Sequence, residues 1–187
     1  MRAFNRRVNG KGTPLTILVV ATLATSLACQ AHGGMMMSTA ELVPLSGSQV
    51  SGTLKFHEPQ HHVVHITGKV EGLTPGKHGF HIHVNGNCDS ADGMSAGGHF
   101  SPAGGRHGVP GAKGGHLGDL GNIVADEKGH ADVNVTVSGV SIALMGSESI
   151  GDRAIVIHAN EDDFSDPAGN AGARVACGVI ESDMMRM

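Results

Sequence analysis

Histidine is the residue type in this 187-residue sequence that most plainly offers chemistry. The chain has 13 His, as many as Lys and Arg together. His81 and His83 flank Ile82 in a run with strand character, where alternation puts the two rings on one face. Two adjacent imidazoles can hold a metal ion, and His is a frequent metal ligand. Such a pair alone is better explained by two surface histidines, so a metal site requires further ligands.

Further ligands lie in the Gly-rich stretch that follows. His99, His107 and His116 are eight and nine residues apart, and Asp119 comes three residues after the last of them. This spacing does not match one helix face, but a loop can wrap such residues around one ion. Three imidazoles and one carboxylate match a closed tetrahedral zinc site. His158 ends a separate apolar run and is available to the His81–His83 pair.

Short β-rich segments must position these ligands. Ile, Val and Thr are frequent in them, Gly, Pro, Asn or Asp separate them, and no segment keeps a helical period for three turns. The expected strands cover residues 40–44, 49–56, 63–70, 79–84, 131–137, 154–158 and 174–180, with a further short strand within 117–125. Regular short strands predict an all-β sandwich or barrel, without an internal repeat.

Two long loops separate these strands, at residues 85–115 and 159–173. Loops of this length are uncommon unless function or a cross-link holds them. Cys88 lies in the first loop and Cys177 in the last strand. Because Cys29 is assigned to an export signal, a Cys88–Cys177 disulfide is expected, with two free buried thiols as the alternative. In the chain-entropy model this disulfide contributes about 4–5 kcal/mol.

The N-terminus reads as an export signal over residues 1–28. Residues 2–11 carry four basic and no acidic residues, and an apolar run over 15–28 follows. This run is shorter than the roughly 20 residues that a transmembrane helix needs. Cys29 comes directly after it, as at a bacterial lipoprotein cleavage site, and a lipid there would anchor the mature protein to a membrane. Ordinary cleavage after Ala28 is the alternative.

Residues 29–39 are expected to form a flexible tether to one domain over residues 40–187. His32 with Met35, Met36 and Met37 could hold copper loosely, or the segment is a disordered linker. The whole chain has 17 acidic and 13 basic residues, and removing residues 1–28 leaves nine basic ones and a net charge of −8. No basic stripe suggests a nucleic-acid partner.

Together these motifs resemble those of copper/zinc superoxide dismutases of the exported bacterial type. The resemblance runs in the family's order over about residues 40–181. Its motifs are GFHIH at 79–83, GHFSP at 98–102, HG at 107–108, HLGDLGN at 116–122, AIVIH at 154–158 and GNAGARVACG at 169–178. It implies an eight-stranded Greek-key barrel or sandwich with two long functional loops.

The resemblance also implies one copper and one zinc ion per subunit. Copper falls to His81, His83, His99 and His158, and zinc to His99, His107, His116 and Asp119. His99 then bridges the metals and takes part in catalysis. Asp162 is the carboxylate that links His81 to His107 behind the metals.

The implied activity is dismutation of superoxide to dioxygen and hydrogen peroxide, an antioxidant defence in the periplasm or cell envelope. Arg174 is the expected anion guide, with a structural salt bridge as the alternative, and Arg106 and Lys113 are further steering candidates. A copper-binding protein without activity and a purely structural surface protein are the alternative classes. A homodimer fits the resemblance, but no motif decides the oligomeric state.

The remaining histidines are expected to have no part in the metal site. His78 matches a hydrogen-bonded brace, and His130 reads as a turn residue. Four more surround Pro59 and are expected on the surface of a hairpin rather than in a second metal site: His57, His61, His62 and His65.

Overall fold

The computed structural model describes residues 36–182, which form an all-β domain with one short 3-10 helix at Met94–Ala96. The strands are β1 (Met37–Pro44), β2 (Ser51–Gln60), β3 (Val63–Glu71), β4 (Gly76–His83), β5 (Asp119–Ala125), β6 (Ala131–Ser138), β7 (Ala154–His158), β8 (Arg174–Val179) and β9 (Glu181–Ser182). In this part of the chain no helix has the length and apolar character needed to cross a membrane.

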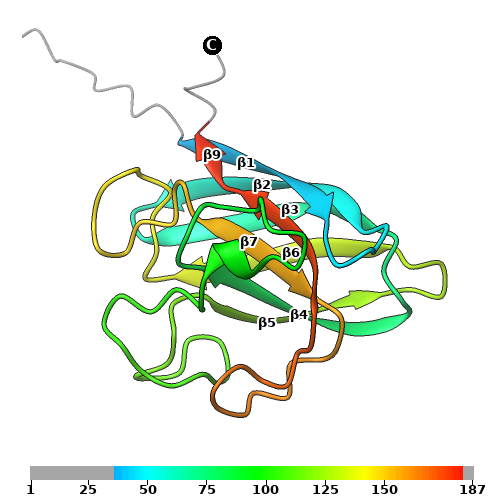
Figure 1. The fold of residues 1–187 in the computed structure, drawn as a ribbon. Helices are drawn as coiled ribbons and strands as arrows, with labels where there is room; N and C mark the ends of the chain where they lie inside the picture. The colour runs from blue at the N-terminus through cyan, green and yellow to red at the C-terminus, as the bar shows by residue number, and fades with distance from the viewer. Residues whose placement is uncertain (1–35, 183–187) are drawn as a thin grey trace, which may run out of the picture. The chain divides into compact units, whose positions relative to one another are not determined.

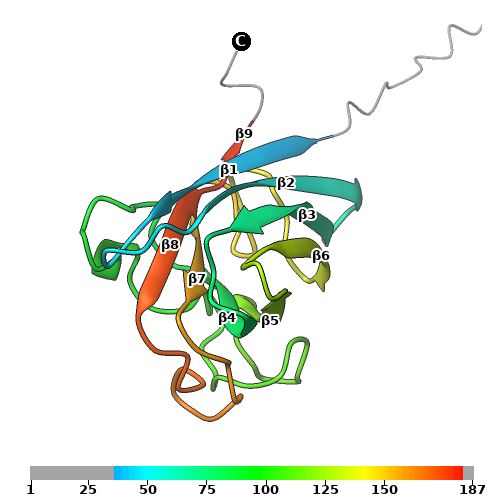
Figure 2. The same ribbon diagram turned by 90° about the vertical axis from the view of Figure 1, so that its right-hand side faces the viewer.

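The strands build one antiparallel, nearly closed barrel (Figures 1 and 2). Their order is β5-β4-β7-β8-β1-β2-β3-β6, and β9 pairs with β1. β5 and β6 stand at the two ends of this order but follow each other in the chain and lie close together. The predicted eight-stranded Greek-key barrel is therefore confirmed, with the short β9 as an addition.

Alternation along the strands decides which side chains fill the barrel. In β2, Leu54 and Phe56 are buried in the core, whereas Lys55 between them is exposed. β4 is buried on both faces from His78 onward. Phe80 and Ile82 enter the barrel core, so His81 and His83 lie on the opposite face of the strand.

The two long loops cover that opposite face of β4. The backbone of Ile82 receives a hydrogen bond from Phe100 and donates one to Gly118, which fastens the first loop to the strand. The second loop is fastened where the Gly79 N–H donates to the Asn160 carbonyl, 2.8 Å away. The loops therefore convert the outer face of β4 into an enclosed site.

Several strand boundaries differ from the sequence-based expectation. β1 begins at Met37, so three residues of the predicted 29–39 tether are strand, because they pair with β2 from His57 to Lys55. β4 begins three residues earlier than expected, at Gly76, through pairing with β5. The predicted signal at 1–28, the lipidation candidate Cys29, residues 30–35 of the tether with His32 and Met35, and residues 183–187 lie outside the described residues.

Candidate metal centre

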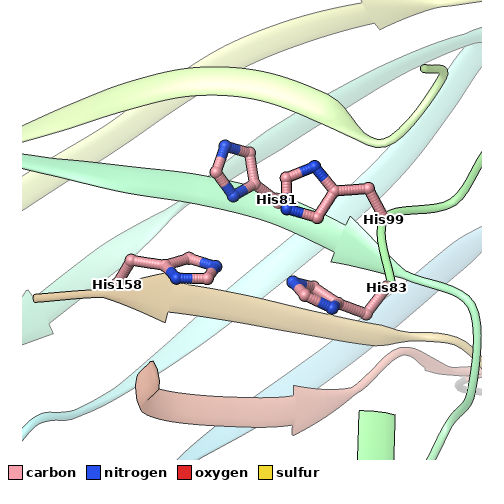
Figure 3. A group of neighbouring side chains, drawn as sticks. All are labelled: His81, His83, His99 and His158. Atoms are coloured by element: carbon pink, nitrogen blue, oxygen red, sulfur yellow. The ribbon is translucent and has the colours of Figure 1, made fainter. Parts of the chain in front are cut away.

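Four histidines from three parts of the chain gather beside β4 and β7. His81 and His83 come from β4, and His158 ends β7. His99 comes from the first long loop, where its backbone forms an isolated antiparallel β-bridge with His83. One ligand nitrogen from each lies within 4.8 Å of the others. Figure 3 shows the four rings arranged around a common space.

In three of these rings one nitrogen makes a hydrogen bond and the other has no hydrogen-bond partner. His81 donates from Nε2 to Asp162 Oδ2 at 2.8 Å, and His83 donates from Nδ1 to the Gly97 carbonyl at 2.9 Å. His158 donates from Nδ1 to the Gly172 carbonyl at 3.2 Å. The opposite nitrogens, His81 Nδ1, His83 Nε2 and His158 Nε2, are buried without a hydrogen-bond partner.

A bound metal ion explains these unpaired nitrogens. A buried polar atom without a partner costs roughly 1–3 kcal/mol, and here three such atoms share one small space. Imidazole nitrogens suit copper. The residues therefore fit the copper ion that the sequence resemblance implies.

The protonation state of the rings favours metal binding. Burial, together with neighbouring histidines, lowers the pKa of His81 to about 2 and that of His158 to about 4. Burial likewise holds the pKa of His83 well below its ordinary value. At neutral pH the three rings are uncharged and offer a lone pair, which is the form that binds metals.

A second group of ligands converges on one oxygen of Asp119. The Nδ1 atoms of His99, His107 and His116 lie 2.9, 2.8 and 3.3 Å from Asp119 Oδ1. Any of these nitrogens that carries no proton repels the carboxylate oxygen, and a divalent cation between them removes the repulsion. The four side chains match in type and number the donors of a closed zinc site, and His99 belongs to both groups.

Asp162 lies fully buried between the two groups. Its Oδ2 accepts from His81 and its Oδ1 accepts from His107 Nε2, both at 2.8 Å. Asn122 holds the Asp162 backbone from both sides, by accepting from its N–H and donating to its carbonyl. Sequence reasoning identified Asp162 but overlooked Asn122, although Asn122 ends one of the motifs used.

The negative charge at this second group is carried by Asp119. Burial opposes ionisation of His107 and Asp119, but their mutual hydrogen bond and those to Asp162 and His99 outweigh it. The pKa of His107 is therefore raised, and that of Asp119 falls to about 2. Asp119 is consequently an anion across the physiological pH range.

Gly169 lets the second loop pass close to this carboxylate. It has a φ of 64°, in the left-handed region, and a Cβ added there would collide with Asp162 Oδ1 and approach His107 Nε2. Only glycine fits this position without displacing the link between the two groups.

Arg174 begins β8 at the edge of the copper group, which consists of His81, His83, His99 and His158. Its Nη1 donates to the Gly93 carbonyl and its Nη2 to the Gly97 carbonyl, each at 2.6 Å. These partners are backbone carbonyls, so its position does not depend on a salt bridge. Arg174 lines a surface cavity of about 550 Å³ together with His83, His99 and His158. Its guanidinium thus stands beside the candidate metal ligands with access to solvent.

The predicted disulfide is confirmed. Cys88 and Cys177 are joined, with their Cα atoms 5.7 Å apart, which rules out two free thiols. The bond ties the first loop to β8. The tied loop carries both carbonyls that hold Arg174.

The remaining histidines of residues 36–182 lie outside both groups. The His78 ring nitrogens are 2.8 Å from the carbonyl oxygens of His158 and Thr74, as expected for a brace. His130 follows the turn between β5 and β6. The four histidines around Pro59 lie on or between β2 and β3.

Comparison with known proteins agrees with this geometry. A family model described as copper/zinc superoxide dismutase matches residues 50–180, which include all seven candidate ligands, Asp162 and Arg174. A solved structure titled "Crystal Structure Analysis of the clock protein EA4" resembles the chain with a TM-score of 0.70 and 37% identity. That likeness covers 78% of this chain and 93% of the other. The chain belongs to the copper/zinc superoxide dismutase family.

Proposed function

We propose that this protein is an active superoxide dismutase, which converts two superoxide anions and two protons into dioxygen and hydrogen peroxide. The observation that carries the proposal is the pair of adjacent donor groups that share His99. One group offers only imidazole nitrogens and borders a solvent-accessible cavity. The other adds a carboxylate and matches a closed structural site.

In the proposed mechanism, His81, His83, His99 and His158 hold copper, while His99, His107, His116 and Asp119 hold zinc. Copper supplies the one-electron redox chemistry that zinc lacks. His81 and His83 are fully buried, so they exclude water from the inner side of the site. Asp162 and the Gly97 and Gly172 carbonyls fix the ring orientations.

Arg174 attracts and orients the anionic substrate. A guanidinium stays charged at any working pH and presents a rigid fork of donors. Two backbone carbonyls hold this one in place, so little conformational freedom is lost when an anion binds. Its position beside His83, His99 and His158 brings the anion to the copper side of the site.

His99 handles a proton. Its Nδ1 is directed to Asp119, so Nε2 is the nitrogen on the copper side, and it would take up a proton and pass it to the reduced oxygen product when it is not a metal ligand. Its ring lies at the cavity, where solvent can restore the proton.

Metal analysis combined with a superoxide-consumption assay tests the proposal. An active enzyme contains about one copper and one zinc per chain, consumes superoxide, and loses activity to cyanide, which competes for copper. Copper without activity would instead identify a copper-binding protein of this fold. Absence of both metals after reconstitution would identify a structural protein.

We also propose that the protein is exported and anchored by lipid on Cys29. The basic and apolar residues before Cys29 support export, and the Cys88–Cys177 disulfide supports an oxidising compartment. Mass spectrometry of the mature N-terminus is the test. A diacylated Cys29 is expected, and an unmodified N-terminus at this position would overturn the anchor.

A further inference from the structure

A row of possible metal ligands crosses the outer face of β1, β2 and β3. His57 on β2 is directly opposite Met37 on β1 and directly opposite His65 on β3. Side chains of directly opposed residues lie on the same face, with Cβ atoms about 4.5–5.5 Å apart. The core side chains Phe56 and Ile66 alternate with this row, so the row faces away from the barrel interior. A thioether and two imidazoles therefore lie side by side.

His57 shares an unusual feature, a buried ring nitrogen without a hydrogen-bond partner, with ligands of the main centre, which comprises the two ligand groups that share His99. Its Nε2 is buried without a hydrogen-bond partner. Among the described residues, the other imidazole nitrogens in this condition belong to His81, His83, His116 and His158. All four are candidate metal ligands. His57 Nε2 is therefore in the same condition as the nitrogens of these ligands, and a bound metal ion would give it a partner.

The spacing of the rings supports a shared ion. The His57 and His65 ring centroids are 6.3 Å apart in an edge-on arrangement. Within the copper group the corresponding separations run from 4.2 Å for His81–His99 to 6.5 Å for His81–His83. The outer pair is therefore no more widely separated than rings that gather around one site.

Strand geometry distinguishes this pair from the two nearby histidines. The pairing of β2 with β3 changes register between His57 and Gln60, and such bulges redirect side chains and often occur next to functional sites. His61 and His62 lie beyond the bulge and stack on each other, with centroids 4.0 Å apart. They are natural control positions, because they share the hairpin but not the row.

We propose that Met37, His57 and His65 form a second metal site, separate from the main centre, that binds monovalent copper. A thioether combined with imidazoles is a soft donor set that favours Cu(I). Lys55, two residues before His57, is exposed on the same face, and its positive charge repels a divalent ion more than a monovalent one. The main centre is built on β4 and β7, so copper here would be additional to the copper of the enzyme.

A Cu(I) titration tests the site on protein already loaded at the main centre. Copper- and zinc-loaded protein is titrated anaerobically with Cu(I) against bicinchoninate, and bound copper is counted. The wild type is expected to bind one more Cu(I) per chain than the double variant His57→Gln with His65→Gln. Met37→Leu should weaken this step by roughly tenfold or more, because it removes the soft ligand. His61→Gln should leave it unchanged.

Equal Cu(I) uptake by the wild type and the double variant would overturn the proposal, and so would an equal loss in His61→Gln. A second measurement, on the wild type alone, does not depend on whether the variants fold. Ag(I), a diamagnetic substitute for Cu(I), should shift the ring resonances of His57 and His65 at one equivalent while those of His61 and His62 stay in place. Unshifted His57 and His65 resonances would count against the site.

Discussion

At the scale of single residues, the metal centre depends on which ring nitrogen each histidine leaves free. Hydrogen bonds to Asp162, Gly97 and Gly172 hold the outer nitrogens of His81, His83 and His158. The inner nitrogens are then the only ones available to a metal. Asp162 differs from the two carbonyls because it acts on both groups, through His81 and His107.

Replacing Asp162 by Asn should therefore weaken both metals together. An amide presents one acceptor and one donor, so one of His81 and His107 faces an N–H in place of its acceptor, and both rings lose the negative charge of the carboxylate. Loss of such an outer hydrogen bond typically lowers metal affinity by roughly 10- to 100-fold. Chelator competition measured separately for copper and zinc checks this. Asp132→Asn, at an exposed position of β6, is the matched control, and unchanged affinities in Asp162→Asn would contradict the linking role.

Replacing Arg174 by Ala should slow catalysis while both metals stay bound. The guanidinium donates hydrogen bonds to two backbone carbonyls and is not itself a candidate ligand, so its loss removes the local attraction for the anion. We expect kcat/KM to fall by roughly 10- to 100-fold. Arg174→Lys should recover part of the rate, because it restores the charge without the fork. Metal analysis accompanies the assay, and loss of copper or fully retained activity would exclude the guiding role.

At the scale of strands and loops, local pattern predicted more of the framework than of the contacts between elements. Alternation placed His81 and His83 on one face, and the run 154–158 was predicted with its observed bounds. β9 was missed because its two residues carry no periodicity and exist as strand only through pairing with β1. The contact of Asn122 with Asp162 and the opposition of His57 and His65 depend on tertiary packing and register, which composition does not encode.

One tie between elements is carried by Glu58. Its Oε1 accepts from the backbone of His62 at 2.9 Å, and its Oε2 accepts from the Ser141 hydroxyl and the Ile142 backbone. Burial opposes ionisation, but these hydrogen bonds outweigh it and lower the pKa of Glu58 below its ordinary value of 4.5. The carboxylate therefore fastens the β2–β3 hairpin to the loop between β6 and β7.

Replacing Glu58 by Gln should destabilise the metal-free protein in a pH-dependent way. A lowered folded-state pKa gives stability that is present above pH 4.5 and lost as the pH falls through the folded value. At pH 7 we expect the variant to lose about 1–3 kcal/mol in the free energy of unfolding. The difference between the wild type and the variant should become smaller below pH 4.5. Denaturant unfolding at several pH values measures this. Glu127→Gln, in an exposed turn, makes the same charge change and should have little effect at any pH.

At the scale of the whole molecule, the net charge opposes the proposed substrate. The whole chain carries −4, and without residues 1–28 it would carry −8, so superoxide is repelled at long range. Local positive charge near the cavity has to offset this repulsion. Arg174 borders the cavity, and Arg106 and Lys113 lie in the loop that carries the zinc ligands.

Ionic strength separates local steering from global repulsion. The Debye length shrinks from about 30 Å at 0.01 M salt to about 8 Å at 0.15 M. If local positive charge dominates the approach, kcat/KM falls as salt is added, whereas a rise would mean that the overall negative charge dominates. Lys113→Gln should lower the low-salt rate by a factor of roughly two and flatten the salt dependence. Lys69→Gln changes the net charge equally but acts on β3, where Lys69 pairs with Asp132. If both variants gave the same curve, charge number rather than charge position would control the rate, and steering by this loop would be excluded.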